Sequence, residues 1–365
     1  MVTASRSDVG VVGLGEAGRR YASIAQDLGC SVVGTDANAN KCNRAERTLN
    51  IETYEEFEPM YDSDIDAVVI ATPNRFHETA AIPALEEDLD IFFEKPLAHD
   101  FESAEQIVDA ANSSESVCMV GYYLPFYECV ETTKSYLEDG YFGDITHIEA
   151  RWIQRRAVPR RGSWYTSKDI AGGGVLQDKG SFLLHLLSHF GYPLQSVESV
   201  EGKIRSEFGK RDDYTSTSMW GGEGHENIFD VEDSVSAFIN FEDGKTATIE
   251  TAWAANTDSD VSLRIRGLDG GAYLDIGTGE LTLYGVRRDR GEALTKTEVQ
   301  PNYEDSVFDA DSDGPTTSVF RERAFQEFLA CRDRGEQPQH SNLSQALAVQ
   351  RAIEDLYTTV DDSEL

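Results

Sequence analysis

Short apolar runs separated by helical patterns dominate the first hundred residues of the chain. Helical spacing over Arg19–Leu28 separates the first two runs, and Gly29 ends this predicted helix. Continuous apolar runs of this length are typical of strands that are buried on both faces of a parallel sheet. Strands are expected at Val9–Val12, Ser31–Gly34, Asp66–Ala71 and Ile91–Phe93. This alternation of strands and helices predicts an α/β domain.

After Arg151 the pattern changes to strands joined by turns. Glu242-Asp243-Gly244 lies between two strand-like runs, which predicts a hairpin, whereas the polar, glycine-rich stretch Phe208–Phe229 is expected to be a loop near the site or an interface. Strands are expected at Val235–Phe241, Thr246–Ala252, Val261–Gly267 and Ala272–Ile276, and helices at Phe320–Cys331 and Leu343–Tyr357. Such a sheet leaves one face free for a second subunit, so we expect a homodimer or homotetramer.

The charge of the chain is strongly acidic and narrows the classes of partner. It has 32 Lys and Arg residues against 66 Asp and Glu residues, a formal net charge of −34. This balance argues against a nucleic-acid partner and against an anionic membrane. The acids are spread along the chain, which favours a halophile's salt-rich interior over a specific basic partner, because molar salt shortens the Debye length to ~3 Å.

Cysteine usage and hydropathy bear on the compartment. The five cysteines are odd in number and show no CxxC or metal-type spacing, so we expect free thiols and no metal site. Met1–Asp8 is polar and lacks the apolar core of a signal peptide, and the apolar runs are too short to span a bilayer. These observations predict a cytoplasmic protein.

A glycine motif follows the first predicted strand and opens the first predicted helix. Gly13 permits a tight turn, Gly15 lets the backbone approach a pyrophosphate, and Gly18 allows the helix to pack closely on the strand. The helix N-terminus favours the anion. We therefore expect a dinucleotide to contact the six residues of this turn, Gly13, Leu14, Gly15, Glu16, Ala17 and Gly18.

An acidic residue follows the second predicted strand at the distance expected for binding the adenosine ribose. Asp36 lies 18 residues after Gly18, close to the ~20 that is typical of this fold. A carboxylate there repels a 2′-phosphate and favours NAD, whereas Lys41 and Arg44 lie within reach of the same loop and keep NADP open.

Polar residues also follow the next two predicted strands. Pro73 stiffens the exit of one strand and Asn74 can cap the helix that follows. Glu94 and Lys95 lie at the C-terminal end of the other strand, where open α/β sheets place their ligands. A lysine beside oxidised nicotinamide would have a lowered pKa and could share in proton transfer. The expected cofactor contacts here are Ala71, Thr72, Pro73, Asn74, His77, Glu94, Lys95 and Pro96.

These motifs, in this order, resemble the glucose–fructose oxidoreductase, inositol dehydrogenase and rhizopine-catabolism (Gfo/Idh/MocA) family. The resemblance continues through segments that span nearly the whole chain: Gly140–Asp144, Trp164, Gly172–Gly174, Asp178-x-Gly180 and Val231–Asp233. It implies a Rossmann domain, here residues 1–124, and an α+β domain with a large, mostly antiparallel open sheet, here residues 125–365. The implied activity is oxidation of a secondary alcohol of a sugar, cyclitol or related polyol by NAD(P).

The resemblance implies a lysine, an aspartate and a histidine around the reacting hydroxyl. Lys95 and Asp178 match the first two, but Phe182 occupies the histidine position and can neither accept nor donate a proton. If Leu176–Phe190 is helical, His185 shares a face with Asp178 and is a candidate replacement; the alternative is a core histidine. Other candidates for the proton are Lys95, Tyr122, Tyr123 and Tyr165.

A cluster of basic residues stands out in this acidic chain. Arg151 and the pairs Arg155-Arg156 and Arg160-Arg161 could steer an anionic substrate, or they could pair with local acids at the surface. The main hypothesis is a sugar or polyol dehydrogenase with Lys95, Asp178 and His185 as catalytic groups. The alternative is a cofactor-binding sensor or regulator with little chemistry, which Phe182 favours. Reduction of an imine or enone also stays open.

Overall fold

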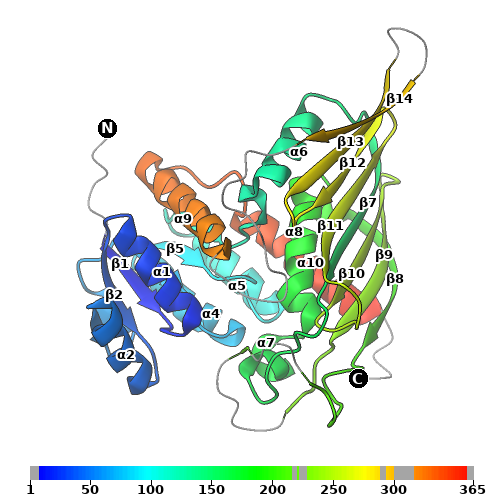
Figure 1. Cartoon of the computed structure of the whole chain (residues 1–365). Helices are drawn as coiled ribbons and strands as arrows, with labels where there is room; N and C mark the ends of the chain where they lie inside the picture. The colour runs from blue at the N-terminus through cyan, green and yellow to red at the C-terminus, as the bar shows by residue number, and fades with distance from the viewer. Residues whose placement is uncertain (1–7, 216–219, 222–227, 288–292, 300–315, 360–365) are drawn as a thin grey trace. The chain divides into compact units, whose positions relative to one another are not determined.

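The computed structural model describes residues 8–215, 220–221, 228–287, 293–299 and 316–359. The chain divides into two compact units. The first comprises Met1–Tyr123 and Arg321–Gln350, and the second comprises Leu124–Phe320 and Arg351–Leu365. Each unit is built around one sheet (Figure 1). Among the described residues, no helix combines the length and the apolar character needed to cross a membrane.

The first unit contains a parallel six-stranded sheet of order β3-β2-β1-β4-β5-β6. The strand order reverses between β1 and β4, where Val9 faces Val32 on one side and Ala67 on the other. The side chains of β4 are all buried, as the apolar pattern predicted. The strands are β1 (Asp8–Val12), β2 (Ser31–Thr35), β3 (Glu52–Tyr54), β4 (Ala67–Ile70), β5 (Asp90–Phe93) and β6 (Cys118–Val120).

Two helices of this unit have side-chain caps, whereas Asn74, which was expected to cap the helix after β4, lies inside a short turn and makes no side-chain cap. Asn38 accepts a hydrogen bond from the Asn40 backbone at the start of α2, and Asp100 accepts one from Ser103 at the start of α5. The elements are α1 (Glu16–Asp27), α2 (Ala39–Leu49), α3 (Glu58–Tyr61), the short 3₁₀ turn η1 (Asn74–Phe76), α4 (His77–Glu86), α5 (Phe101–Ala111) and α9 (Thr316–Arg334).

A late part of the chain belongs to this first unit. Phe325 and Phe328 of α9 pack against Phe92 of β5, and Arg332 forms an ion pair of 2.6 Å with Asp90. The second domain was expected to include all residues after 124, whereas the structure groups Arg321–Gln350 with the first unit. Aromatic packing between positions that are far apart in sequence leaves no local signal, which explains the difference.

The second unit contains an eight-stranded sheet of order β14-β13-β12-β11-β7-β10-β9-β8. Only the β7–β10 pair is parallel, so the expected Rossmann domain and mostly antiparallel large sheet are both confirmed. The predicted hairpin is the β9–β10 pair. The strands are β7 (Ile145–Ile153), β8 (Val197–Arg205), β9 (Ser234–Phe241), β10 (Thr246–Ala252), β11 (Asp260–Gly267), β12 (Gly270–Asp275), β13 (Glu280–Arg287) and β14 (Ala293–Val299).

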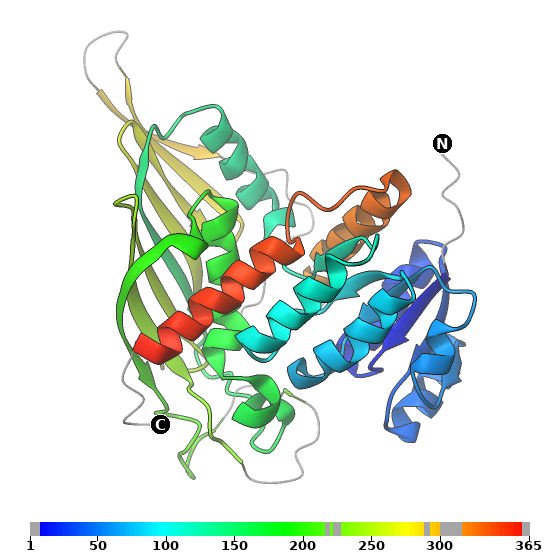
Figure 2. The same ribbon diagram turned by 180° about the vertical axis from the view of Figure 1, so that it is seen from behind.

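Helices cover one face of this large sheet. Figures 1 and 2 show α6 and α8 along that face, while no helix of the described residues covers the other. The elements outside the sheet are α6 (Glu128–Glu138), α7 (Lys168–Ala171), α8 (Ser181–His189) and the short turns η2 (Leu124–Phe126), η3 (Trp164–Thr166), η4 (Leu176–Gly180) and η5 (Leu194–Ser196). The last helix, α10 (Leu343–Thr359), belongs to the first unit up to Gln350 and to the second unit from Arg351.

The segment expected to be one helix over Leu176–Phe190 has two parts. Leu176–Gly180 forms a π-helical turn, η4, and α8 follows from Ser181. A π turn inserts one residue into the helical ladder and is common at functional sites. The regular spacing assumed for this segment therefore fails at the position that carries Asp178. The predicted loop Phe208–Phe229 includes residues 216–219 and 222–227, which lie outside the described residues.

All five cysteines are free thiols, as predicted. Cys118, Cys129 and Cys331 are buried. Burial raises the pKa of the Cys118 thiol to about 12, so this group stays protonated and unreactive at neutral pH.

Candidate functional site

The glycine turn after β1 has the backbone geometry that a dinucleotide site needs. Gly13 has a φ of +92°, and a Cβ there would lie 2.6 Å from the Ala71 carbonyl oxygen, so the turns after β1 and β4 approach each other too closely for a side chain. A Cβ on Gly18 would clash with the Gly13 carbonyl oxygen. Gly15, by contrast, borders open space at the start of α1. The turn thus leaves room for a pyrophosphate at the helix N-terminus.

Asp36 lies directly after β2, and its carboxylate ties this strand end to the glycine turn. Its Oδ2 accepts a hydrogen bond from the Leu14 backbone at 2.8 Å, and its Oδ1 accepts one from the Asn38 backbone at 2.9 Å. The Lys41 ammonium lies 3.2 Å from Oδ2. The carboxylate is therefore held at the edge of the glycine turn, as binding of an adenosine ribose requires, and Lys41 already pairs with it.

His77 bridges two loops at the ends of the parallel strands. Its Nε2 lies 3.0 Å from the Thr72 carbonyl oxygen and its Nδ1 lies 3.2 Å from the Leu97 carbonyl oxygen. The ring is fully buried, and burial lowers its pKa although both carbonyls oppose this shift. His77 therefore joins the loop after β4 to the Glu-Lys-Pro loop after β5, and its predicted contact with the cofactor stays a prediction.

The buried carboxylate of Glu94 restrains the Glu-Lys-Pro loop after β5. Its Oε2 accepts a hydrogen bond from the Lys95 backbone at 3.0 Å, and the Arg321 guanidinium of α9 lies 3.8 Å from Oε1. Both side chains are largely buried, and Arg321 also stacks over the Tyr123 ring at 4.9 Å. An ion pair in this environment fixes the backbone that presents Lys95. Sequence reasoning missed Arg321 because it lies more than 200 positions away.

In the second unit a buried carboxylate organises the glycine-rich segment before η4. Glu232 accepts hydrogen bonds from the backbone of Gly174 at 2.9 Å, from the backbone of Leu176 at 2.9 Å and from the Tyr357 hydroxyl at 2.8 Å. A Cβ on Gly174 would clash with the Glu232 backbone, which explains the glycine. Burial raises the pKa of Glu232, and these donors oppose the shift.

Asp178 lies in the π turn that this carboxylate fixes. Its Oδ2 accepts a hydrogen bond of 2.9 Å from Nε1 of Trp253, which is fully buried. The Lys179 ammonium lies 3.4 Å from the same oxygen. Neither Trp253 nor Lys179 was singled out from the sequence, although a lysine between apolar helical residues is a signal that spacing alone could have flagged.

Phe182 and His185 occupy the buried side of this segment. Phe182 is 1% exposed and stacks on Trp152 with ring centroids 5.4 Å apart. His185 is 1% exposed, within a helix whose residues from Ser181 to Leu187 are all buried. Its environment is that of a core residue, the alternative considered above, and its catalytic role stays a prediction.

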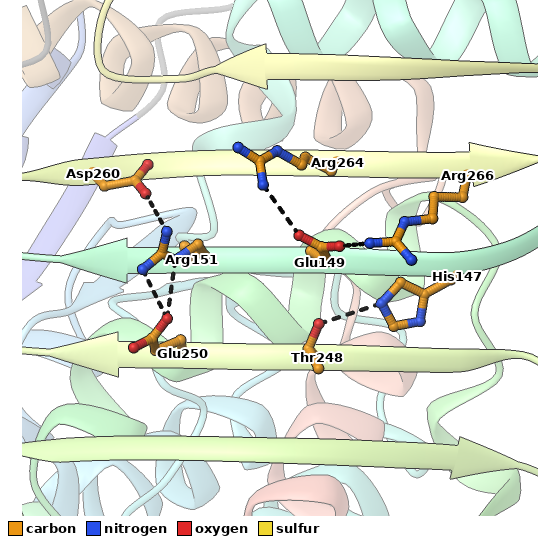
Figure 3. A network of polar contacts seen from close by, with 8 residues as sticks. All are labelled: His147, Glu149, Arg151, Thr248, Glu250, Asp260, Arg264 and Arg266. Atoms are coloured by element: carbon orange, nitrogen blue, oxygen red, sulfur yellow. Dashed lines mark hydrogen bonds and ion pairs between the residues drawn. The ribbon is translucent and has the colours of Figure 1, made fainter.

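Three of the five arginines in this basic cluster, Arg151, Arg156 and Arg161, have side-chain partners in the second unit. Figure 3 shows Arg151 between Glu250 and Asp260, at 2.8 and 3.0 Å, on the face of the sheet that no described helix covers. Arg161 pairs with Asp212 at 3.3 Å. Arg156 donates to the Thr215 carbonyl and to Asn256. This arrangement supports local pairing rather than steering of an anionic substrate.

The predicted site residues therefore gather in two groups. In the first unit, the glycine turn and the strand ends that carry Asp36, Ala71 and Lys95 follow neighbouring strands of one sheet, and Gly15 in this turn borders open space. In the second unit, Asp178 lies with Lys179 and Trp253.

Comparisons with known proteins agree with the two-domain fold. Residues 7–122 match the model of an oxidoreductase family with an NAD-binding Rossmann fold (GFO_IDH_MocA), and residues 130–273 match the GFO/IDH/MocA C-terminal domain. The solved structure of a levoglucosan dehydrogenase in complex with NADH and L-sorbose is similar in fold, with a TM-score of 0.80 and 21% identity over 97% of this chain and 96% of that one.

Two curated relatives share more sequence over shorter segments. The levoglucosan dehydrogenase of Pseudarthrobacter phenanthrenivorans is 30% identical over 57% of this chain and 55% of its own length. The D-glucoside 3-dehydrogenase of Escherichia coli is 29% identical over 52% of this chain and 53% of its own length. The matches thus span about half of each relative. Because the two family models together span most of the chain, it belongs to the GFO/IDH/MocA oxidoreductase family.

Proposed function

We propose that this protein is an NAD-dependent dehydrogenase that oxidises a secondary alcohol of a sugar or related polyol. The observation that carries the proposal is the glycine turn, which leaves space at Gly15 and holds Asp36 at its edge. The relatives named for levoglucosan and for D-glucosides support a sugar as the substrate. When bound, the nicotinamide supplies the hydride acceptor.

The side chains of the two units have different proposed roles in binding and proton transfer. Lys95 hydrogen-bonds the reacting hydroxyl and shares its proton, because its loop follows β5 at the ligand edge of the parallel sheet. Glu94 and Arg321 fix that loop from the interior. Asp178 orients the sugar, and the Trp253 indole restrains its carboxylate.

NAD is proposed as the cofactor rather than NADP. The Asp36 carboxylate would repel a 2′-phosphate, and the Lys41 ammonium that could bind such a phosphate is already paired with Asp36. The choice of cofactor does not depend on the identity of the substrate, so NAD and NADP can be compared with the same sugar.

The experiment that tests the function is turnover at high salt. The protein is incubated with NAD or NADP and a panel of levoglucosan, methyl glucosides, D-xylose and inositol, and reduced cofactor is followed at 340 nm. We expect NADH with at least one sugar and loss of at least 100-fold in kcat for Lys95→Met. An unchanged Lys95→Met variant would refute the assignment of Lys95. Tight NAD binding without turnover of any polyol would instead support the sensor alternative that Phe182 favours.

We further propose that two copies associate through the uncovered face of the large sheet. Figure 3 shows charges of opposite sign alternating there, with Glu149 between Arg264 and Arg266. Phe238 is 39% exposed and stacks beside His147 on the same face. Light scattering after size exclusion would give the mass of a dimer or tetramer, and a monomer at micromolar concentration would contradict this proposal.

Adaptation to a salt-rich interior is proposed from the net charge of −34. Self-repulsion of the acidic surface weakens when the Debye length falls from ~10 Å at 0.1 M salt to ~3 Å at 1 M. We expect the urea midpoint to rise steadily from 0.1 to 3 M KCl, with sorbitol as the non-ionic control. Equal stability in salt-free buffer would refute the adaptation.

A further inference from the structure

We propose that Lys179 binds the substrate beside Asp178 and so takes the place left by Phe182. This inference rests on the proposed function and adds a binding residue to it. The ligand class is a sugar whose hydroxyl at or next to the reacting carbon accepts a hydrogen bond from the Lys179 ammonium.

The position of the Lys179 ammonium carries the proposal. It lies 3.4 Å from Oδ2 of Asp178, 5.2 Å from the ring centroid of Trp152 and 5.3 Å from that of Trp220. Two indole faces and one carboxylate therefore fix the cation, since each such contact is attractive. An ammonium carries three donor hydrogens, so it can serve Asp178 and a sugar hydroxyl together.

The cost of this position also points to a ligand. The Lys179 side chain is only 12% exposed, and burial of an ammonium is expensive unless it is paired, as it is here with Asp178. Buried charged pairs of this kind are candidates for functional sites. The neighbouring positions Leu176, Phe182 and Leu183 are apolar and buried. A chain that only needed packing here would carry another apolar side chain.

Phe182 is part of the same arrangement. It stacks on Trp152, and the Trp152 ring lies beneath the Lys179 ammonium. The aromatic side chain at the usual histidine position thus packs against Trp152, one of the two indole rings that contact Lys179. By contrast, His185 is 1% exposed, whereas the side chain of Lys179, whose ammonium contacts Asp178, is 12% exposed.

The aromatic side chains next to Lys179, Trp220 and its neighbour Tyr165, suit the apolar face of a sugar ring. Trp220 and Tyr165 are half-buried, with ring centroids 4.7 Å apart, and Tyr165 stacks on Trp164 at 3.7 Å. Rings with an apolar body and a polar edge contact both the C–H face and the hydroxyls of a sugar. We therefore expect a pyranose or its glycoside rather than an acyclic polyol.

The test compares Lys179→Met and Lys179→Arg with Lys245→Met in the full chain at high salt. Lys245 is a matched control because it also pairs with a nearby aspartate, Asp243, and lies over an aromatic ring, that of Tyr192, at 5.9 Å, but on the β9–β10 turn. Binding of levoglucosan and methyl glucoside in the presence of NADH is measured by tryptophan fluorescence, because all four tryptophans lie in the second unit. NADH affinity and Tm are measured in parallel, and steady-state kinetics follow.

We expect Lys179→Met to weaken sugar binding and raise KM by about tenfold or more, with NADH affinity unchanged. Lys179→Arg should retain most of the binding, and Lys245→Met should match the wild type. Sugar binding by Lys179→Met that equals the wild type would overturn the proposal, as would equal losses in Tm and in NADH affinity, which indicate a structural role.

The same experiment distinguishes failure of the proposed dehydrogenase function from failure of the role proposed for Lys179. A wild type that binds sugar without turnover contradicts the dehydrogenase but leaves the binding comparison intact, and Lys179→Met then decides the role of Lys179. A wild type that binds no sugar of the panel overturns both proposals.

Discussion

Removal of the Tyr357 hydroxyl is predicted to loosen the segment that carries Asp178. The Tyr357 hydroxyl donates to Oε1 of Glu232 at 2.8 Å, and the same oxygen accepts from the Leu176 backbone at 2.9 Å. Glu232 is 1% exposed. The Tyr357→Phe variant deletes this single donor and leaves the aromatic ring in place, so the effect reports on one hydrogen bond.

The magnitude follows from the kind of hydrogen bond that is lost. A hydrogen bond to a charged group contributes about 1.5–3 kcal/mol, and the half-buried position of Tyr357 favours the lower end of that range. The hydroxyl is also one of the groups that lower the pKa of Glu232, so this pKa rises further in the variant. A carboxyl whose pKa is raised on folding lowers the free energy of unfolding at pH values where it is ionised. The variant should therefore be less stable than the wild type when Glu232 is ionised, and this difference should shrink as the pH falls through the pKa of Glu232.

The assay is urea unfolding followed by tryptophan fluorescence, which reports on the second unit alone because Trp152, Trp164, Trp220 and Trp253 all lie there. Tyr192→Phe is the matched control. Its hydroxyl is buried and has no hydrogen-bond partner among the described residues, so its loss should change the free energy of unfolding by less than about 0.5 kcal/mol. A Tyr357→Phe effect no larger than that of Tyr192→Phe would refute the role given to Glu232.

Three further predictions concern single side chains. Asp36→Asn should shift the ratio of kcat/KM for NAD over NADP by about tenfold or more toward NADP, because Lys41 is then free to pair with a phosphate; an unchanged ratio would remove Asp36 as the selector. Trp253→Phe should lower kcat by about tenfold or more through loss of the 2.9 Å bond to Asp178, and a kcat equal to wild type would show that the bond does not position the carboxylate. Burial lowers the pKa of His77, so the folded state binds a proton less readily than the unfolded chain. The contribution of His77 to the free energy of unfolding is therefore complete above about pH 6.5 and is lost as the pH falls below that value. In the His77→Gln variant, the free energy of unfolding, measured with urea and circular dichroism, should depend less on pH in this range.

The sequence predicted the parallel sheet and the glycine turn of the first unit well because their signals are local. Gly13, Gly15 and Gly18 fall within six consecutive residues, and a strand and a helix flank them. The order of the strands then follows from general rules on parallel sheets. The hairpin of β9 and β10 was equally accessible, since its turn residues lie between two strands of matching length.

The packing of α9 and the shape of η4 could not be predicted from the sequence, because both involve contacts between residues that are far apart along the chain. Arg321 meets Glu94 across more than 200 positions, and neither residue carries a local sign of the other. The π turn at Leu176–Gly180 has the composition of an ordinary helix, and the backbone N–H of its first residue donates to the carboxylate of Glu232, which comes from another part of the chain. Helical spacing therefore pointed to His185, while the turn itself brings Lys179 beside Asp178.

The acidic composition adds a constraint on where positive charge can lie. In a chain of net charge −34, most cations near the surface find an acidic partner, as Arg151 and Arg161 do. A lysine held between two indole rings has fewer competing acids around it, because aromatic rings occupy the space that carboxylates would otherwise fill. The Lys179 ammonium can then meet a neutral sugar hydroxyl even at the salt concentrations that screen surface pairs, since a partly buried charge is screened much less than an exposed one.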